Sequence, residues 1–298
     1  MFSKKSNRNL WILFIVLLIA VILIFSTEST KKERSFRKDI VSVDTSAVSS
    51  MIIYPKSKPG MKVELLNSDG IWKVLGENSK SYTVPKSKIE NLFNQLLMIT
   101  PKRVAARSKS KWTEYQVDSS ATRIVVNEDG SEALNLVIGK FSFQQPRSMS
   151  TYVRLWDENE VYEVDGFLEM TFNKDINSFR DETIIKSNKD EWTRLLFEST
   201  ENESLELLKI DNKWTLNGLE TDSAKTVKAL NDLSRLTSTD FIDDREQVSL
   251  PPQLFSLTIE TSESQQIQVF GYKDNSRYLV YSSQNPENYF DGNKLDEK

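Results

Sequence analysis

The sequence contains no cysteine and no histidine among its 298 residues. Without histidine there can be no Ser-His-Asp triad, and without cysteine there can be neither a thiolate nucleophile nor a disulfide. Zinc sites built from His or Cys ligands are excluded for the same reason. Carboxylates are therefore the only plentiful groups left for acid–base chemistry, and the absence of thiols suits an oxidising compartment.

Beyond the N-terminal segment, acidic side chains outnumber basic ones. Residues 1–38 carry eight basic and two acidic side chains, which leaves 31 basic and 41 acidic side chains in the rest of the chain. That body has a net charge of −10 and would repel a polyanion, whereas nucleic-acid binding needs clustered Lys and Arg. We therefore expect no nucleic-acid partner.

Only one long apolar run is present, from Leu10 to Phe25, and no charged residue interrupts it. Residues 10–27 could cross roughly 30 Å of hydrocarbon, and no small-residue cleavage site follows, as it would in a signal peptide. We predict a cytoplasmic tail over 1–9, a transmembrane helix over 10–27 and a linker over 28–49.

The orientation follows from the tail. Basic residues flank the apolar run on both sides, so the rule that positive charge stays inside does not decide it, but long following domains translocate largely regardless of charge. We expect a single-pass protein of the cell (inner) membrane, with a cytoplasmic N-terminus and an extracytoplasmic or periplasmic body.

An internal repeat organises that body. The segment 63–74 (VELLNSDGIWKV) aligns without gaps on the segment 205–216 (LELLKIDNKWTL). The centre of each is a turn, Asp69-Gly70 or Asp211-Asn212, made of residues that tolerate positive φ. Each copy therefore predicts a β-hairpin.

An amphipathic helix is expected after each hairpin. Apolar residues recur there at helical spacing: Ile89, Leu92, Phe93, Leu96 and Leu97 in the first copy, and Val227, Leu230, Leu233 and Leu236 in the second. Trp72 and Trp214 occupy equivalent positions, and we expect each ring to be buried over its own helix.

Strands resume after both helices. Alternating apolar residues predict hairpins over 123–138 and 254–270, further strands over 152–156, 161–164 and 278–281, and a polar C-terminus; a short helix is expected over 167–179. The predicted fold class is α+β, with two tandem repeats of antiparallel hairpins, each packed by one helix, over residues 50–186 and 187–298.

These features together resemble a bacterial family, the domain-of-unknown-function family numbered 4340. The resemblance rests on the hairpin ending in Trp, the Leu-rich helix, a meander ending near Ile138-Gly139, the strands 151–154 and 161–162, and Phe179-Arg180-Asp181. A Gly-Leu-x-x-Pro element that the family carries between helix and meander is replaced here by residues 114–118.

The resemblance implies a membrane-anchored extracytoplasmic protein with an accessory role beside ABC-type transporters related to the gliding-motility auxiliary system. It implies no catalytic residue.

The aromatic residues of one strand form the candidate binding face. Alternation places Tyr152, Arg154 and Trp156 on one side of it. A solvated face of this kind could bind a glycan or a protein edge, whereas core packing would explain the same rings structurally. For Arg180, pairing within the chain to close the repeat is the simpler interpretation.

The carboxylate pairs Glu128-Asp129 and Asp243-Asp244 have the spacing of neither a glycosidase nor a calcium loop. We therefore predict no catalytic residue, no cofactor and no metal. The favoured function is a non-enzymatic, membrane-tethered accessory module with protein partners in an envelope complex, and the family resemblance implies ABC-type transporter subunits among these partners. The alternatives are an envelope polysaccharide-binding module and a hydrolase that uses carboxylates alone.

Overall fold

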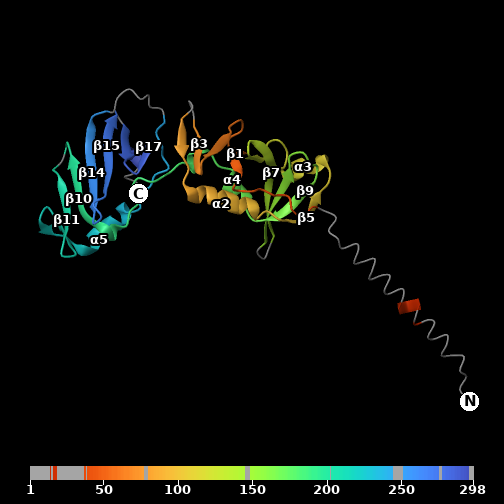
Figure 1. Ribbon diagram of the computed structural model, residues 1–298, viewed down its shortest axis with the longest axis horizontal. Helices are drawn as coiled ribbons and strands as arrows, with labels where there is room; N and C mark the ends of the chain where they lie inside the picture. The colour runs from red at the N-terminus through yellow and green to blue at the C-terminus, as the bar shows by residue number, and fades with distance from the viewer. Residues whose placement is uncertain are drawn as a thin grey trace, which may run out of the picture.

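Two β-rich lobes lie side by side in the computed structural model (Figure 1). The structure describes residues 14, 16–18, 37, 39–76, 80–144, 148–201, 203–243, 251–274 and 277–294. The predicted transmembrane helix over 10–27 lies almost entirely outside these residues. Among the described residues, no helix is both long enough and apolar enough to cross a membrane.

The first lobe is a nine-stranded antiparallel sheet in the order β4-β3-β2-β1-β6-β7-β8-β9-β5. Its strands are β1 (Val48–Tyr54), β2 (Val63–Ser68), β3 (Ile71–Leu75), β4 (Ser81–Thr83), β5 (Pro101–Ala106), β6 (Thr122–Glu128), β7 (Ser131–Gln144), β8 (Ser148–Leu155) and β9 (Val161–Asp165). Its helices are α2 (Lys86–Leu97), α3 (Trp112–Tyr115) and α4 (Leu168–Phe172), with short 3₁₀ turns η2 (Lys109–Lys111) and η3 (Ile176–Phe179).

The second lobe repeats this order with eight strands, β13-β12-β11-β10-β14-β15-β16-β17. Its strands are β10 (Trp192–Ser199), β11 (Leu205–Ile210), β12 (Lys213–Leu216), β13 (Leu219–Glu220), β14 (Gln253–Thr261), β15 (Gln266–Asp274), β16 (Arg277–Ser282) and β17 (Asn285–Asp291). Its helix is α5 (Ser223–Leu233), and the turns η4 (Lys189–Glu191) and η5 (Gly292–Lys294) flank the sheet.

A short segment after α5 takes the place that β5 has in the first lobe. Phe241 forms an isolated antiparallel bridge with Phe290 of β17, and the Ile242 amide donates to the Tyr289 carbonyl at 2.9 Å. This pairing holds the following residue, Asp243, at the edge of the sheet that faces the first lobe.

The predicted hairpins 63–74 and 205–216 are confirmed. Asp69 and Gly70 between β2 and β3 have φ of 53° and 84°, and Asp211 and Asn212 between β11 and β12 have φ of 46° and 63°. Two successive residues with positive φ give a turn whose twist matches the flanking strands. These local residue types therefore set the register of both hairpins.

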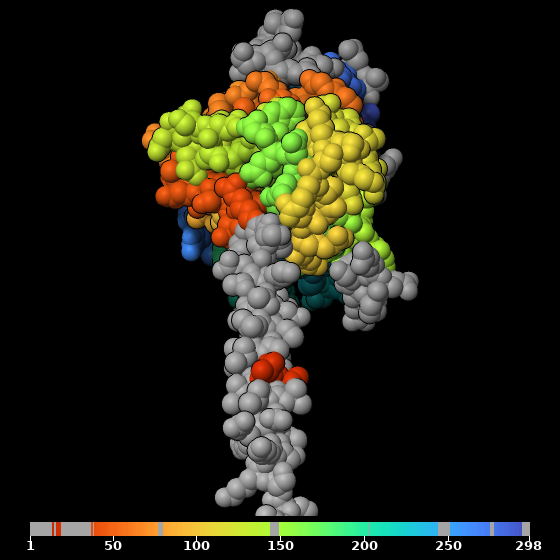
Figure 2. All heavy atoms as spheres, turned by 90° about the vertical axis from the view of Figure 1, so that its right-hand side faces the viewer, coloured from red at the N-terminus to blue at the C-terminus, as the bar shows by residue number. Residues whose placement is uncertain are grey.

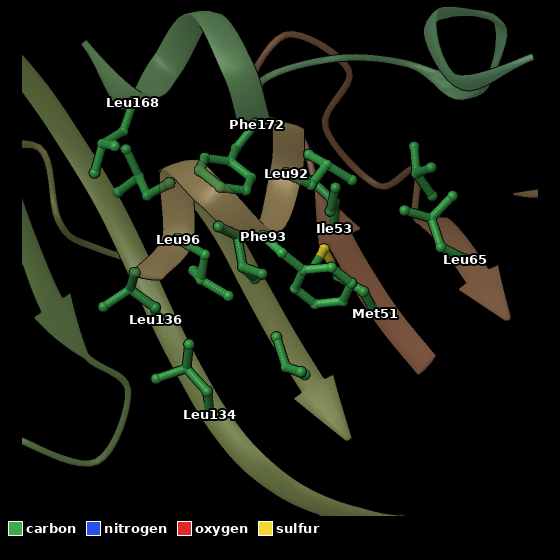
Figure 3. Close-up of a cluster of buried hydrophobic side chains, with 14 of the residues drawn as sticks. Met51, Ile53, Leu65, Leu92, Phe93, Leu96, Leu134, Leu136, Leu168 and Phe172 are labelled. Carbon is green, nitrogen blue, oxygen red and sulfur yellow. The ribbon is translucent and has the colours of Figure 1, made fainter. Parts of the chain in front are cut away.

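The core of the first lobe lies between α2 and its sheet (Figure 3). Ile89, Leu92, Phe93 and Leu96 of α2 are buried there, whereas Leu97 is 47% exposed and does not belong to the predicted stripe. Phe172 of α4 is also buried in this core, so two helices cover the same face. Burying each large apolar side chain contributes about 1.5–3 kcal/mol.

The core of the second lobe is smaller. Thr226 and Leu230 are the buried residues of α5, and Val227 of the predicted stripe is 45% exposed. Asp222 caps the helix by accepting hydrogen bonds from the amides of Ala224 and Lys225.

Three expectations need correction. The predicted helix over 167–179 is two separate pieces, α4 and η3, and the expected polar C-terminus contains β17, in which Phe290 is fully buried. The residues assigned to the linker include Ile40, which is 3% exposed in the first core, and Val48, which begins β1. All three features depend on contacts between segments that meet only in the folded chain.

Candidate functional site

The two lobes meet at a buried arginine. Arg180 follows η3, whose first turn is capped by the Asp175 side chain accepting from the Ser178 amide at 3.2 Å. Arg180 itself has an extended backbone conformation, and its side chain contacts residues of the second lobe. It is only 1% exposed.

Asn177 of η3 accepts one hydrogen bond from Arg180 Nη1 at 3.2 Å, and the second lobe supplies the other side-chain acceptors. Nη1 of Arg180 donates to both carboxylate oxygens of Asp243, at 2.8 and 2.7 Å, and Nε donates to Oδ1 of Asn288 at 2.9 Å. Charge-assisted bonds of this kind are about twice as strong as neutral ones. A second acceptor fixes the plane of the guanidinium, which a lysine ammonium could not reproduce.

Aromatic rings enclose the same guanidinium. Its carbon lies 3.6 Å from the ring centroid of Tyr82 in the first lobe and 3.9 Å from that of Phe241 in the second. Cation–π contacts gain strength when they are desolvated. We call the group formed by Tyr82, Arg180, Phe241, Asp243 and Asn288 the interlobe clamp.

Further contacts extend the clamp along β4. The hydroxyl of Tyr82 donates to Asp243 at 2.9 Å, and the Thr83 amide donates to Glu287 at 2.5 Å. Burial, helped by the hydrogen bond to Asp243, raises the pKa of Tyr82 to about 12. Burial also raises the pKa of Glu287, but the hydrogen bonds from Thr83 and the charge of Lys73 outweigh it and hold the pKa below its usual value.

A cavity of about 510 Å³ opens beside the clamp. Its charged lining residues are Lys58, Lys80, Asp175, Arg180, Asp243, Arg277 and Asp291. Asp175 pairs with Lys58 at 2.8 Å, and Asp243 pairs with Arg180. Burial raises the pKa of Asp175, but the hydrogen bonds from Lys58 and Ser178 keep it below the usual value. This carboxylate is thus ionised at neutral pH and is a poor proton donor.

Of the predicted binding face, Tyr152 and Arg154 are buried and Trp156 is half-buried. Alternation along β8 is correct, since Tyr152 and Trp156 pack in one cluster and Val153 in the other. However, Tyr152 is 6% and Arg154 1% exposed, because α3 and the residue Val117 after it cover this side of the strand. Figure 2 shows the yellow segment that contains β5 and α3 lying against the green strands.

Arg154 has a structural role in this cluster. Its Nε donates to the Val117 carbonyl at 3.1 Å, and Nη1 donates to the carbonyls of Leu155 and Trp156 at 2.9 and 2.6 Å. Its guanidinium carbon also lies 3.7 Å from the ring centroid of Trp112. The side chain therefore ties α3 to the end of β8.

The two equivalent tryptophans differ. Trp72 is 9% exposed and packs edge-on against Phe93 of α2, with 5.7 Å between ring centroids. Trp214 is only half-buried at the edge of the second core. The expected burial is confirmed for Trp72 and wrong for Trp214.

The sequence pattern identified Arg180 but not its partner. In the sequence, Asp243 stands out only as half of an acidic pair with Asp244, and Asp244 lies outside the described residues. Nothing in the local sequence points from Arg180 to a residue 63 positions away. Within the described ranges, no group of three or more Asp or Glu side chains is arranged to hold a metal ion.

One protein family, described as a domain of unknown function (DUF4340), matches residues 72–253. The chain belongs to this family. The matched region begins at Trp72 and includes α2, the strands β6–β9 and Arg180 of the interlobe clamp. Comparison with curated proteins and with solved structures gave no significant match.

Proposed function

We propose that this chain is a non-enzymatic accessory module, tethered to the cell membrane by a helix over residues 10–27, with its body outside the cytoplasm. Its two repeats would present one rigid surface to protein partners in an envelope complex, such as an ABC-type transporter. The interlobe clamp is the observation that carries this proposal.

The clamp supports a scaffold rather than a closing cleft. An arginine that is 1% exposed and bonded to Asp243 and Asn288 holds the lobes in one arrangement. Opening the lobes would break these hydrogen bonds together with the ring contacts that Tyr82 and Phe241 make with the guanidinium. Hinged closure around a ligand needs lobes that move relative to each other, and these contacts oppose such motion.

The cavity beside the clamp also favours a non-enzymatic scaffold over a hydrolase that uses carboxylates alone. Two of its three carboxylates, Asp175 and Asp243, already form ion pairs with Lys58 and Arg180. A hydrolase of this class needs one carboxyl with a raised pKa as general acid. The pKa of Asp175 is shifted the other way.

Photo-crosslinking in native membranes tests the proposal. A photo-reactive residue would replace Met170 or Leu219, which are 66% and 74% exposed on different lobes. We expect both to capture subunits of one membrane complex, and Arg180→Ala to reduce capture because the lobes lose their fixed arrangement. Arg194→Ala, which removes a half-exposed arginine outside the clamp, is the matched control.

Topology is tested separately on the full chain. Protease added to spheroplasts should digest the body, and a reporter fused after Lys298 should be active outside the cytoplasm. A body that stays protected until the membrane is lysed would refute the proposed location. Crosslinks that Arg180→Ala and Arg194→Ala reduce equally would refute the scaffold role.

A further inference from the structure

The second lobe contains a hollow of about 490 Å³ between the β11–β12 hairpin and the start of α5. Trp214 lines this hollow together with Thr226, Val227 and Leu230 of α5. We call it the Trp214 hollow. It lies within one lobe and is separate from the interlobe clamp.

Comparison of the two lobes explains why the hollow exists. Phe93 and Leu230 are each the eighth residue of their helix, so a leucine stands in the second lobe where a phenylalanine covers Trp72 in the first. Tyr82 of β4 is 5% exposed, whereas Leu219 of the corresponding strand β13 is 74% exposed. With a smaller helix residue and an outward-facing strand, the Trp214 ring is left partly uncovered.

The rim of the hollow is polar and carries lysines. Lys189, Lys209 and Lys213 line it together with two carboxylates, Asp190 and Glu220. Lys189 pairs with Asp190 at 2.9 Å, and Lys213 pairs with Glu220 at 3.4 Å. The Lys209 ammonium donates to the main-chain carbonyl of Asp190 and lies 5.9 Å from the Trp214 ring centroid. Three cations therefore face two anions.

This combination fits one class of ligand. An aromatic face accepts the apolar C–H side of a sugar ring, while convergent polar groups at the rim can bind its hydroxyls. The excess positive charge favours a carboxylate on the ligand. We propose that the Trp214 hollow binds an acidic saccharide, with its ring against Trp214 and its carboxylate near Lys209.

Calorimetric titration of the full chain in detergent micelles tests this site. Tetragalacturonate is the probe, and maltotetraose is its neutral counterpart. We expect tetragalacturonate to bind at least tenfold more tightly than maltotetraose. Trp214→Leu should weaken that binding at least tenfold, and Lys209→Gln should weaken it while leaving the thermal midpoint unchanged.

Trp72→Phe is the matched control, because it alters the equivalent tryptophan of the first lobe and should leave the affinity unchanged. Lys209→Gln keeps the test decisive if Trp214→Leu fails to fold. The absence of binding heat at millimolar tetragalacturonate would overturn the proposal, as would an affinity that neither variant changes. Equal binding of the neutral probe would also overturn it.

Discussion

Arg180 and Asp243 form an ion pair across the two lobes, in which the single nitrogen Nη1 donates to both carboxylate oxygens, at 2.8 and 2.7 Å. The two side chains differ in exposure, at 1% for the arginine and 43% for the aspartate. Water can therefore solvate the aspartate if the pair is broken, but not the arginine. The stability of the junction between the lobes therefore depends on the acceptors that remain bonded to Arg180.

Removing the carboxylate should destabilise the protein more than removing a surface pair. We expect Asp243→Ala to lower the free energy of unfolding by about 2–4 kcal/mol, since a buried guanidinium loses its charge partner. Glu260→Ala breaks the half-exposed contact with Arg194, and we expect a loss within about 1 kcal/mol. Urea unfolding measures both, and equal losses would contradict the assignment.

The Tyr82 hydroxyl should titrate late. Its pKa is raised from 10.0 to about 12, so the folded state holds this proton more tightly than the unfolded chain does. The resulting stabilisation is complete below pH 10 and is lost as the pH rises through about 12. We expect the absorbance titration at ~295 nm, taken as wild type minus Tyr82→Phe, to show one group near pH 12.

Tyr82→Phe should also flatten the stability loss between pH 10 and about 12. Tyr162 serves as the comparison, because burial and the nearby Glu160 also raise its pKa, but it lies outside the clamp. A difference spectrum with its midpoint at the ordinary tyrosine value would show that the Tyr82 hydroxyl is neither buried nor held by Asp243.

Truncating the two equivalent tryptophans should give unequal effects. Trp72→Ala removes a buried ring that packs on Phe93, and we expect it to cost about 3–5 kcal/mol. Trp214 is half-buried beside a hollow, so we expect Trp214→Ala to cost about 1–2 kcal/mol. Thermal and urea unfolding of both variants measure the difference. Equal costs would mean that the hollow is closed in solution.

The folded body should require residues ahead of β1. Ile40 is 3% exposed in the first core, and Val41 and Val43 pack against the same cluster. We expect a fragment of residues 39–298 to be soluble and to unfold at a higher midpoint than a fragment of residues 48–298, which begins at β1. Ile40→Ala in the longer fragment should cost about 2–5 kcal/mol. Equal midpoints for the two fragments would show that this segment does not stabilise the lobe.

Features that depend on neighbours in the chain could be predicted from the sequence. The turns at Asp69-Gly70 and Asp211-Asn212 were recognisable because few residue types tolerate positive φ. The buried stripe of α2 followed from helical spacing, and the alternation along β8 followed from the two-residue period of a strand. The α+β class and the family resemblance rest on these local signals.

The sequence near a strand does not show whether one of its faces is exposed to solvent or covered by another segment. Tyr152 and Arg154 lie on the side of β8 that alternation assigns to them, but α3, which comes earlier in the chain, covers that side. The failure to place β17 has a similar cause, because its burial depends on pairing with β16 and on contact with Phe241.

The sequence by itself therefore determined the chemistry that is excluded, the hairpins, the helical stripes and the repeat, because each depends on residue type and short-range periodicity. Tertiary structure alone decided that Arg180 meets Asp243 and that Trp214, unlike Trp72, is left partly uncovered. The physical reason is that burial and ion pairing are set by segments that approach only after the sheets form, and no spacing along the chain records which segments those are.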